Sequence, residues 1–333
     1  MIALSVIIPT RNRAAYARDA VRSALEQTLD PASYEVIVVD NGSRDTTRGE
    51  LDELNRACGG RIRYLCDERP GLHVGRNLGA REARSGLLVY TDDDVLADRG
   101  WLRAILDAFA DPSVALVGGK VLPRWEGPVP AWIEQFRGRV GHGSCLGYLS
   151  LIDLGDQMIE VAPEYVFGCN FSIRRSVLDE CGGFHPDAMP QELIRYRGDG
   201  ESAVSAAIRQ RGMKAVYAPG ALVCHRIPPQ RLTVRYFCRR AFNQGVSDSF
   251  TEIRRLGGLP PSEPCPPARR ARRALSAVRL ALARVAAPNS PRTIGRQVAR
   301  ALEIGSSYHR RQVARDPDLL RYVLQKDYLG DSP

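Results

Sequence analysis

Apolar runs alternate with amphipathic segments through the first third of the chain. Residues 4–8, 34–39 and 87–90 are short runs rich in β-branched residues, as in strands that a parallel sheet buries on both faces. Residues 14–28 instead place apolar side chains at helical spacing. A shorter strand is expected over 61–66, and helices over 46–57, 77–85 and 101–110. This alternation predicts an α/β fold with a Rossmann-like, mostly parallel sheet flanked by helices.

The middle of the chain is less regular. Strands are expected over 114–121, 166–174, 215–217 and 221–224, and a helix over 201–211. Residues 123–150 are rich in Gly, Pro and aromatic residues, which is typical of binding loops and lids.

Beyond residue 230 the pattern becomes helical and is interrupted at Gly257, Gly258 and the Pro-rich stretch 260–267. We therefore divide the chain into residues 1–112, residues 113–250, a linker over 251–267 and a basic helical C-terminal extension over 268–333.

Polar residues gather where the predicted strands end. Thr10, Arg11 and Asn12 follow the first strand, Asp40 ends the second, and Asp92–Asp94 follow the fourth. Ligands of open α/β sheets bind beyond the carboxyl ends of the strands, so these positions predict a site independently of any motif.

Three consecutive acids are the strongest single signal. Asp92, Asp93 and Asp94 repel one another unless a cation lies nearby, and alternation along a strand puts Asp92 and Asp94 on one side. Such oxygen ligands suit Mg²⁺ or Mn²⁺ bridging a diphosphate. The alternative is a helix cap, which is weakened because Asp94 lies seven positions before the helix at Trp101.

The 333 residues are 44% hydrophobic and 26% charged, which excludes a wholly disordered chain. The net charge is +9, and residues 261–310, with ten Arg, no Lys and two acids, carry +8 of it. This balance permits nucleic acid, a membrane or a phosphorylated ligand and selects none of them.

Residues 268–286 predict a basic amphipathic helix, with Leu275, Val278, Leu282 and Val285 at helical spacing among arginines. Such a helix either lies on an anionic membrane surface or packs on the rest of the protein. Nucleic acid is not expected, because aromatic residues are not interleaved with the arginines.

The cysteine pattern contains no CxxC pair and no zinc-site spacing, so we expect reduced thiols in a cytoplasmic protein. No signal-peptide pattern and no stretch of 18 apolar residues is present.

Several motifs occur in a characteristic order. VIIPTRNR, VVDNGSRD, GLHVGRNLGARE and YTDDDV together resemble the nucleotide-sugar half of an inverting glycosyltransferase of family 2, which has a GT-A fold. FGCNFSIRR, GGF, GDGE and RQRGMKAVYAPGALVCH resemble its acceptor half. The resemblance covers residues 3–245. It implies that residues 1–112 bind the nucleotide-sugar and that residues 113–250 bind the acceptor and catalyse transfer.

The resemblance also implies roles for the donor residues. The nucleotide would be contacted by Pro9, Thr10, Arg11 and Asn12. Asp40 would contact the edge of the nucleobase, and Arg76 would contact the nucleobase and the phosphates. Asp92 would face the ribose, Asp94 would ligate the metal, and Asp93 would share either role. Asp40 in an Asx-turn and Arg76 as a solvated helix-start residue are the structural alternatives.

For the catalytic base, the motif position falls on Glu201, with Asp199 second. The sequence departs here from the family's Glu-Asp pair, and a helix-capping role for Glu201 is the alternative. His225 matches a histidine near the metal, although a lone His is more often structural.

The resemblance places Gly168 and Asn170 in the wall between donor sugar and acceptor. Trp125 and Trp132 either stack on an acceptor sugar or fill the core. Arg226, Arg231 and Arg235 either hold an anion or form a solvated face.

The function that the resemblance implies is metal-dependent inverting transfer of a sugar from a nucleoside-diphosphate sugar to a hydroxyl of a glycan, a lipid-linked sugar or a small molecule. The resemblance favours UDP as the nucleotide, with GDP and dTDP as open alternatives. The QxxRW signature of processive members is absent, which favours addition of few sugars during polysaccharide or glycoconjugate synthesis. The expected location is the cytoplasm or the inner membrane face. One alternative is an inactive scaffold protein that keeps the GT-A fold. A nucleotidyltransferase is less favoured, because this sequence lacks the Gly-rich, basic N-terminal loop of such enzymes.

Overall fold

The computed structural model describes residues 2–261 and 267–329, with side chains within 267–277 described only at Leu275. The first part contains β1 (Leu4–Thr10), α1 (Ala14–Leu25), β2 (Tyr34–Asp40), α2 (Thr47–Ala57), β3 (Ile62–Cys66), α3 (Leu72–Glu82), β4 (Leu87–Thr91), β5 (Val95–Ala97) and α4 (Trp101–Ala108). The second contains β6 (Val114–Trp125), β7 (Gly138–Val140), β8 (Gly143–Leu146), β9 (Leu151–Asp153), β10 (Ile159–Glu160), β11 (Asn170–Arg174), α5 (Arg175–Glu180), α6 (Glu201–Gln210), β12 (Lys214–Ile227) and α7 (Val234–Leu256). Short 3₁₀ helices lie at Pro31–Ser33, Ala131–Phe136, Gly147–Leu149, Pro163–Tyr165, Gln191–Tyr196 and Pro229–Arg231.

These strands form one mixed sheet. Its main path runs β3-β2-β1-β4-β11-β6-β9-β8-β7, and β12 joins β6. Strands β1 to β4 are parallel, β11 is antiparallel to both β4 and β6, and β12 is parallel to β6. The predicted α/β sheet flanked by helices is confirmed, with β11 as the strand that reverses direction at its centre.

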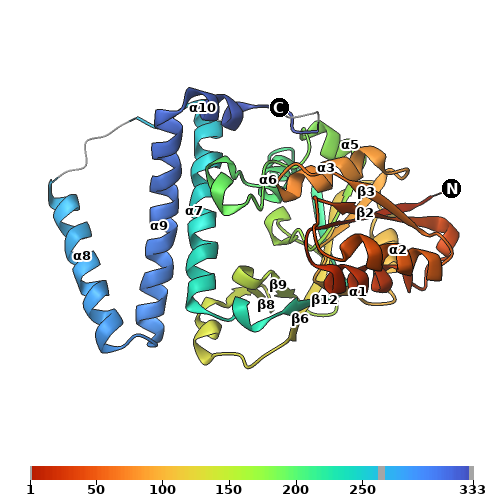
Figure 1. Ribbon diagram of the computed structural model, residues 1–333, viewed down its shortest axis with the longest axis horizontal. Helices are drawn as coiled ribbons and strands as arrows, with labels where there is room; N and C mark the ends of the chain where they lie inside the picture. Colours follow the sequence, from red (N-terminus) through yellow and green to blue (C-terminus); the bar gives the residue numbers. More distant parts are fainter. Residues whose placement is uncertain (1, 262–266, 330–333) are drawn as a thin grey trace.

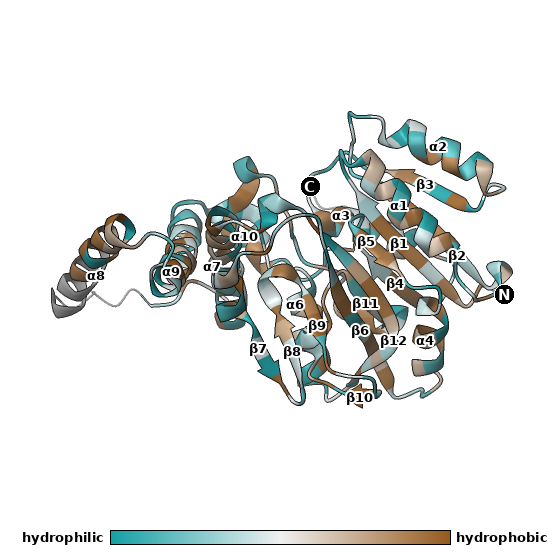
Figure 2. Ribbon diagram, turned by 90° about the horizontal axis from the view of Figure 1, so that it is seen from below, coloured by the Kyte–Doolittle hydropathy of each residue, from teal (hydrophilic) through white to brown (hydrophobic). Residues whose placement is uncertain are grey.

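Burial on both faces explains why the central strands are almost wholly apolar. In β1, Val6 and Ile8 pack with Val21 of α1 on one face, whereas Ile7 packs with Ala80 of α3 on the other. Alternation of side chains along a strand requires this division. Figure 2 shows hydrophobic residues concentrated on the central strands and polar residues on the outward sides of the covering helices.

Two elements differ from the expected boundaries. The helix expected over 77–85 is α3, which begins at Leu72 directly after Gly71, whose φ is +117°. The two short strands expected at 215–217 and 221–224 are one strand, β12, with a register shift between Ala218 and Val223. Pro219 and Gly220 lie in this irregular part, where a central strand tolerates such residues.

The C-terminal region contains α8 (Pro267–Ala286), α9 (Pro291–Arg315) and α10 (Pro317–Leu324). Helix α7 runs through the expected boundary at residue 250 and ends before Gly257, whose φ is +66°. Figure 1 shows α7 and α9 side by side along their length and α8 at the end of the molecule away from the sheet. The division into four regions stays a prediction, since α7 joins the second and third of them in one helix.

Two glycines allow α7 and α9 to touch backbone to backbone. A Cβ atom on Gly245 would lie 2.0 Å from the carbonyl oxygen of Leu302, and one on Gly305 would lie 2.0 Å from that of Phe242. In the same contact, the Nδ1 atom of His309 lies 2.9 Å from the hydroxyl of Ser249.

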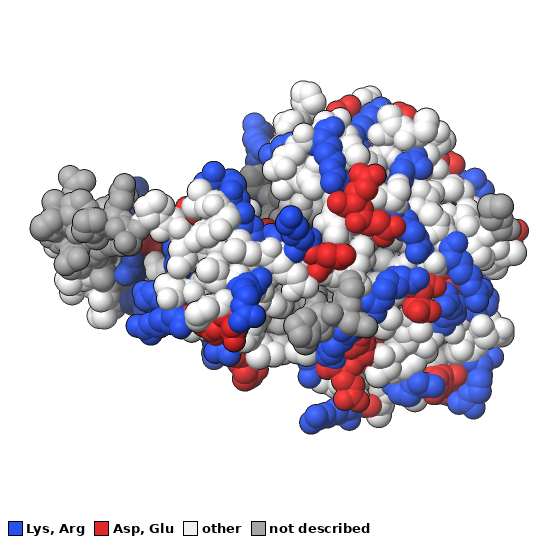
Figure 3. All heavy atoms as spheres, turned by 90° about the horizontal axis from the view of Figure 1, so that it is seen from above, with Lys and Arg blue, Asp and Glu red and all other residues white. Residues whose placement is uncertain are grey.

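Helix α8 presents the apolar residues of the predicted amphipathic helix to solvent. Leu275, Val278, Leu282 and Val285 are between 51% and 85% exposed. Within the described part of the chain, none of the helices combines the length and hydrophobicity needed to cross a bilayer. In Figure 3, basic and acidic side chains are interspersed over the visible face of the larger part of the molecule, which contains the sheet.

Seven cysteines carry free thiols in the described residues: Cys58, Cys66, Cys145, Cys169, Cys181, Cys224 and Cys238. Cys265 lies outside them.

Replacing Gly305 with Ala should separate α7 from α9. A methyl group cannot fit 2.0 Å from a carbonyl oxygen, so we expect a loss of about 2 kcal/mol in the free energy of unfolding, as is usual for overpacking. Gly295→Ala is the matched control, since its Cβ meets only the side chain of Gln135 at 3.5 Å. It should leave stability unchanged or raise it by up to about 1 kcal/mol. Urea unfolding of both variants checks this, and equal stabilities would contradict the close contact.

Candidate active site

A cavity of about 360 Å³ lies at the carboxyl ends of β1 and β4. This is the central cavity. Its wall includes the following predicted site residues: Pro9, Thr10, Arg11, Arg76, Asp92, Asp93, Asp94, Gly168, Glu201 and His225. Residues from both sequence halves therefore meet in one place, as expected from a sheet whose parallel strands end at a common edge.

Asp93 and Asp94 are buried and both contact the guanidinium group of Arg13. Thr10 donates a hydrogen bond to Oδ2 of Asp93 at 2.8 Å, and Arg13 reaches Oδ1 of Asp93 at 2.5 Å and Oδ2 of Asp94 at 3.0 Å. Burial, opposed by Arg13, raises the pKa of Asp93 to about 7. Sequence reasoning missed Arg13, although its place just after Thr10 in the strand-end motif was an available signal.

The two carboxylate oxygens of Asp94 differ in their contacts. Oδ2 accepts hydrogen bonds from Arg13 and Arg231. Oδ1 is buried without a hydrogen-bond partner and lies 3.5 Å from Nε2 of His225. Burial alone would raise the pKa of Asp94, but His225, Arg231 and Arg13 hold it well below its usual range.

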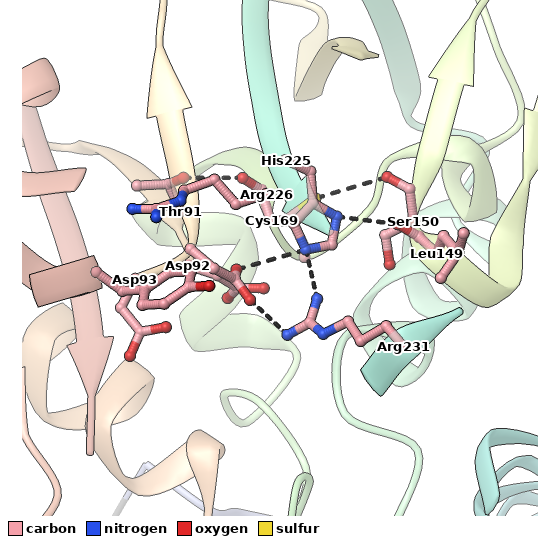
Figure 4. A network of polar contacts seen from close by, with 12 residues as sticks. Thr91, Asp92, Asp93, Leu149, Ser150, Cys169, His225, Arg226 and Arg231 are labelled. Atoms are coloured by element: carbon pink, nitrogen blue, oxygen red, sulfur yellow. Dashed lines mark hydrogen bonds and ion pairs between the residues drawn. The ribbon is translucent and has the colours of Figure 1, made fainter. Parts of the chain in front are cut away.

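Strand pairing places His225 beside Asp94. Residue 225 of β12 is opposite Val95 of β5, and the amide of Arg226 donates to the carbonyl of Asp94 at 2.9 Å. Nδ1 of His225 lies 2.9 Å from the carbonyl oxygen of Leu149, so it carries the proton and leaves Nε2 as the acceptor. Arg231 approaches that Nε2 at 2.7 Å (Figure 4).

Asp94 and His225 provide two potential ligands for a divalent cation. Oδ1 of Asp94 is buried and unpartnered, which suits Mn²⁺. Nε2 of His225, whose tautomer a backbone carbonyl fixes, becomes a second ligand only when Arg231 turns away from it. Asp92 is instead paired with Arg76 at 3.2 Å. Among the described residues, no three His, Cys, Asp or Glu side chains converge on one metal position.

Arg76 connects the acidic strand end to Glu201. Its side chain is only 3% exposed and lies 3.2 Å from Asp92, 3.2 Å from Glu201 and 3.1 Å from the carbonyl oxygen of Gly168. Burial alone would lower the pKa of Arg76, but Glu201 and Asp92 raise it above its ordinary value. Arg76 is therefore a permanent buried cation, not a solvated helix-start residue, and it fixes Glu201 at the cavity.

The two candidate bases point to different places. Glu201 is the first residue of α6, is 29% exposed and lines the cavity. Asp199 is buried between His185 and Thr251, at 2.6 Å from each, and is not among the residues that line the cavity. The geometry thus favours Glu201.

Two other expected donor residues, the buried Asp40 and the exposed Asn12, are held in contacts of their own. Asp40 accepts hydrogen bonds from the amide of Ser43 at 2.7 Å and from Tyr64 at 2.5 Å. The bond to Ser43 is a local turn contact three residues on, one residue further than in the Asx-turn considered as its structural alternative. Asn12, with φ +53°, accepts from the amide of Arg44. Neither residue is among those lining the cavity.

The expected acceptor residues are mostly used in packing. Asn170 is buried, accepts a hydrogen bond from Trp101 at 2.9 Å and donates to the carbonyl of Ala221 at 2.8 Å. Trp132 packs edge-on against Phe237, and Trp125 ends β6 beside Ile227. These three do not line the cavity, whereas Gly168 does.

The basic residues at and after the end of β12 also differ in their contacts. Arg231 lines the cavity, but Arg226, near the end of β12, is paired with Glu126 at 2.6 Å and with Asp19 at 3.0 Å. Sequence reasoning missed Asp187, Arg197 and Arg240, which also line the cavity and come from an irregular loop and from α7.

The comparisons with known proteins agree with this architecture. The family model described as "Glycosyl transferase family 2" matches residues 5–182, more than half of the chain. A mannosyltransferase from Pyrobaculum calidifontis, solved with GDP-Man and Mn²⁺, superposes with a TM-score of 0.55 at 22% identity, covering 96% of this chain and 85% of that one. A structure of S. aureus TarS with UDP-GlcNAc covers 74% of this chain and 68% of that one, with a TM-score of 0.50 and 16% identity.

Curated relatives are also sugar-transferring enzymes. A glucosyl-dolichyl phosphate glucuronosyltransferase from Haloferax volcanii is 27% identical over 75% of this chain and 77% of its own length. A pre-mycofactocin glycosyltransferase from Mycobacterium tuberculosis is 28% identical over 73% of this chain. The match covers 46% of that relative's length, so this chain spans about half of it. The fold and site define a glycosyltransferase with a GT-A fold. The chain belongs to glycosyl transferase family 2.

Replacing Asn170 with Ala should lower the free energy of unfolding. The change leaves the indole N–H of Trp101 and the carbonyl of Ala221 without their partner, so we expect a loss of about 2–4 kcal/mol from two unsatisfied buried groups. Urea unfolding measures this. If unfolding is unchanged while nucleotide-sugar binding is lost, the residue faces the ligand instead.

Proposed function

We propose that the protein transfers a sugar from a nucleoside-diphosphate sugar to an acceptor hydroxyl with inversion and with a divalent cation. The observation that carries the proposal is the common position of Glu201, the Asp94–His225 pair and Arg76 in one cavity at the strand ends. A UDP-sugar is the donor we favour. The GDP-Man and UDP-GlcNAc in the two similar structures support donors of this class.

The strand-end residues hold the donor in this proposal. Pro9, Thr10 and Arg11 form the nucleotide edge of the cavity, and Asp92 faces the ribose. Arg13 and Arg231 place two guanidinium groups beside Asp94, where they are able to turn to an entering diphosphate. A divalent cation bound at Asp94 and His225 supplies further neutralisation of the leaving nucleoside diphosphate.

Glu201 acts as the base. Its carboxylate accepts the proton of the acceptor hydroxyl as the new glycosidic bond forms and the bond to the diphosphate breaks. Arg76 holds Glu201 through one of its oxygens, at 3.2 Å, which orients the other oxygen toward the acceptor. A single displacement with a base and without a protein nucleophile inverts the anomeric centre.

Relatives differ in the acceptors that their names state, so the acceptor is a separate question. We propose transfer of one or a few sugars in glycoconjugate synthesis. The exposed apolar residues of α8, in a helix whose sequence has arginines and no acids, support peripheral contact with an anionic membrane surface.

Two substitutions separate binding from chemistry. Asp94→Asn should abolish the Mn²⁺-dependent part of nucleotide binding, because it removes the charge of the proposed metal ligand. Titration calorimetry with UDP, GDP and dTDP, each with and without Mn²⁺, measures this binding and identifies the nucleobase that the site prefers. Asp107→Asn, an exposed carboxylate on α4, is the control. Equal affinities of wild type and Asp94→Asn with Mn²⁺ present would contradict the metal assignment.

Glu201→Gln should keep nucleotide affinity and reduce turnover of the donor sugar by about 10²–10⁴-fold, which is the usual contribution of a general base. Release of nucleoside diphosphate from the donor measures the rate. Wild-type turnover in Glu201→Gln would exclude this residue as the base, and absence of nucleotide binding in the wild type would overturn the proposed function.

A further inference from the structure

A second cavity of about 540 Å³ adjoins the central cavity. We call it the side cavity. The two share Tyr148, Ser150, Arg197, Glu201 and Arg240 in their walls. Glu201 therefore faces both spaces, so a molecule in the side cavity has access to the proposed base without passing the acidic strand end.

Helix α7 connects the two cavities along one face. Tyr236, Arg240 and Gln244 follow one another at intervals of four residues, which places them on one side of the helix. Tyr236 lines the central cavity, Arg240 lines both cavities and Gln244 lines the side cavity. A ligand in the side cavity thus meets a guanidinium group where the two spaces join.

Most charges around the side cavity are already paired. Glu201 is paired with Arg76 at 3.2 Å, Arg197 with Asp187 at 2.6 Å, and Glu164 with Arg209. Arg139 of β7 and Arg240 of α7 have no ion pair within the described residues. Arg240 lies near Asp187, and its charge lowers the pKa of that carboxyl, but the two form no ion pair. Two guanidinium groups from different elements, neither of them in an ion pair among the described residues, suit the side cavity to an anion.

Four aromatic side chains also contribute to this wall. Phe136, Tyr148, Tyr165 and Phe167 line the side cavity. Such rings pack against a sugar ring or a prenyl chain. The combination of two guanidinium groups with an aromatic wall fits an amphipathic molecule with a compact anionic group.

We propose that the acceptor is a phosphorylated molecule bound in the side cavity, with its phosphate between Arg139 and Arg240 and its hydroxyl at Glu201. This rests on the proposed function, in which Glu201 accepts the hydroxyl proton. A phosphate has enough oxygens to accept hydrogen bonds from both guanidinium groups, and arginine forks match its geometry. The phosphate belongs either to a prenyl-linked sugar or to a free sugar phosphate.

The competing assignment for Arg240 is the diphosphate of the donor, because Arg240 also lines the central cavity. Arg139 distinguishes the acceptor assignment from the donor assignment, because it lines the side cavity and is not among the residues that line the central cavity. Loss of Arg139 should affect acceptor binding alone.

The test is calorimetric titration of the full chain, saturated with UDP and Mn²⁺, at fixed ionic strength. The probes are farnesyl phosphate and glucose 1-phosphate, with farnesol and glucose as their unphosphorylated counterparts. We expect at least one phosphorylated probe to bind at least tenfold more tightly than its counterpart. Preference for farnesyl phosphate indicates a prenyl-linked acceptor, and preference for glucose 1-phosphate a free sugar phosphate.

Arg139→Gln and Arg240→Gln should each weaken that binding at least tenfold, and Arg139→Gln should leave the affinity for UDP unchanged. Arg99→Gln, which removes an exposed charge outside both cavities, is the matched control. Phosphorylated and unphosphorylated probes of equal affinity, or wild-type affinity in both variants, would overturn the proposal. If UDP does not bind, the probes are titrated alone, so that failure of the donor site is seen separately from failure of the side cavity.

Discussion

Five carboxylates line the central cavity, and the four at the strand ends and at the start of α6 set the main electrostatic constraint on this molecule. Asp92, Asp93, Asp94 and Glu201 would repel one another in a partly buried site unless cations were built in among them. Arg76 joins Asp92 to Glu201, and Arg13 joins Asp93 to Asp94. In the proposed function, an entering diphosphate offers these arginines phosphate oxygens in place of their carboxylate partners, because guanidinium groups match phosphate geometry.

The C-terminal helices take part in the same construction. Helix α7 carries Tyr236 and Arg240 into the cavities, and α9 is held against α7 by the glycine contact at Gly245 and Gly305. A segment that looks like an appendage in the sequence therefore supports one wall of the site. Its outermost helix, α8, is the part that leaves apolar side chains in solvent.

The position of Glu201 between two cavities suggests how such enzymes diversify. The central cavity is built from strand ends, whose geometry the sheet fixes. The side cavity is built from β7, β8, a 3₁₀ helix at Pro163–Tyr165 and one face of α7. If the side cavity binds the acceptor as proposed, substitutions there would change the acceptor while the strand ends of the donor half stay the same.

The sequence by itself determined the α/β fold, and it predicted the strand ends as the place of the cavity together with many of the polar residues that line it. Buried parallel strands need continuous apolar runs, and a change from apolar to acidic residues such as Tyr90 to Asp94 marks where such a strand ends. The tertiary structure decided what local pattern does not contain. Asp199 and Asn170 are used in internal hydrogen bonds, whereas Arg13, Arg197 and Arg240 reach the cavities. The reason is that a side chain's partner, unlike its helix or strand, depends on residues that are distant in sequence and meet only when the sheet and α7 have packed.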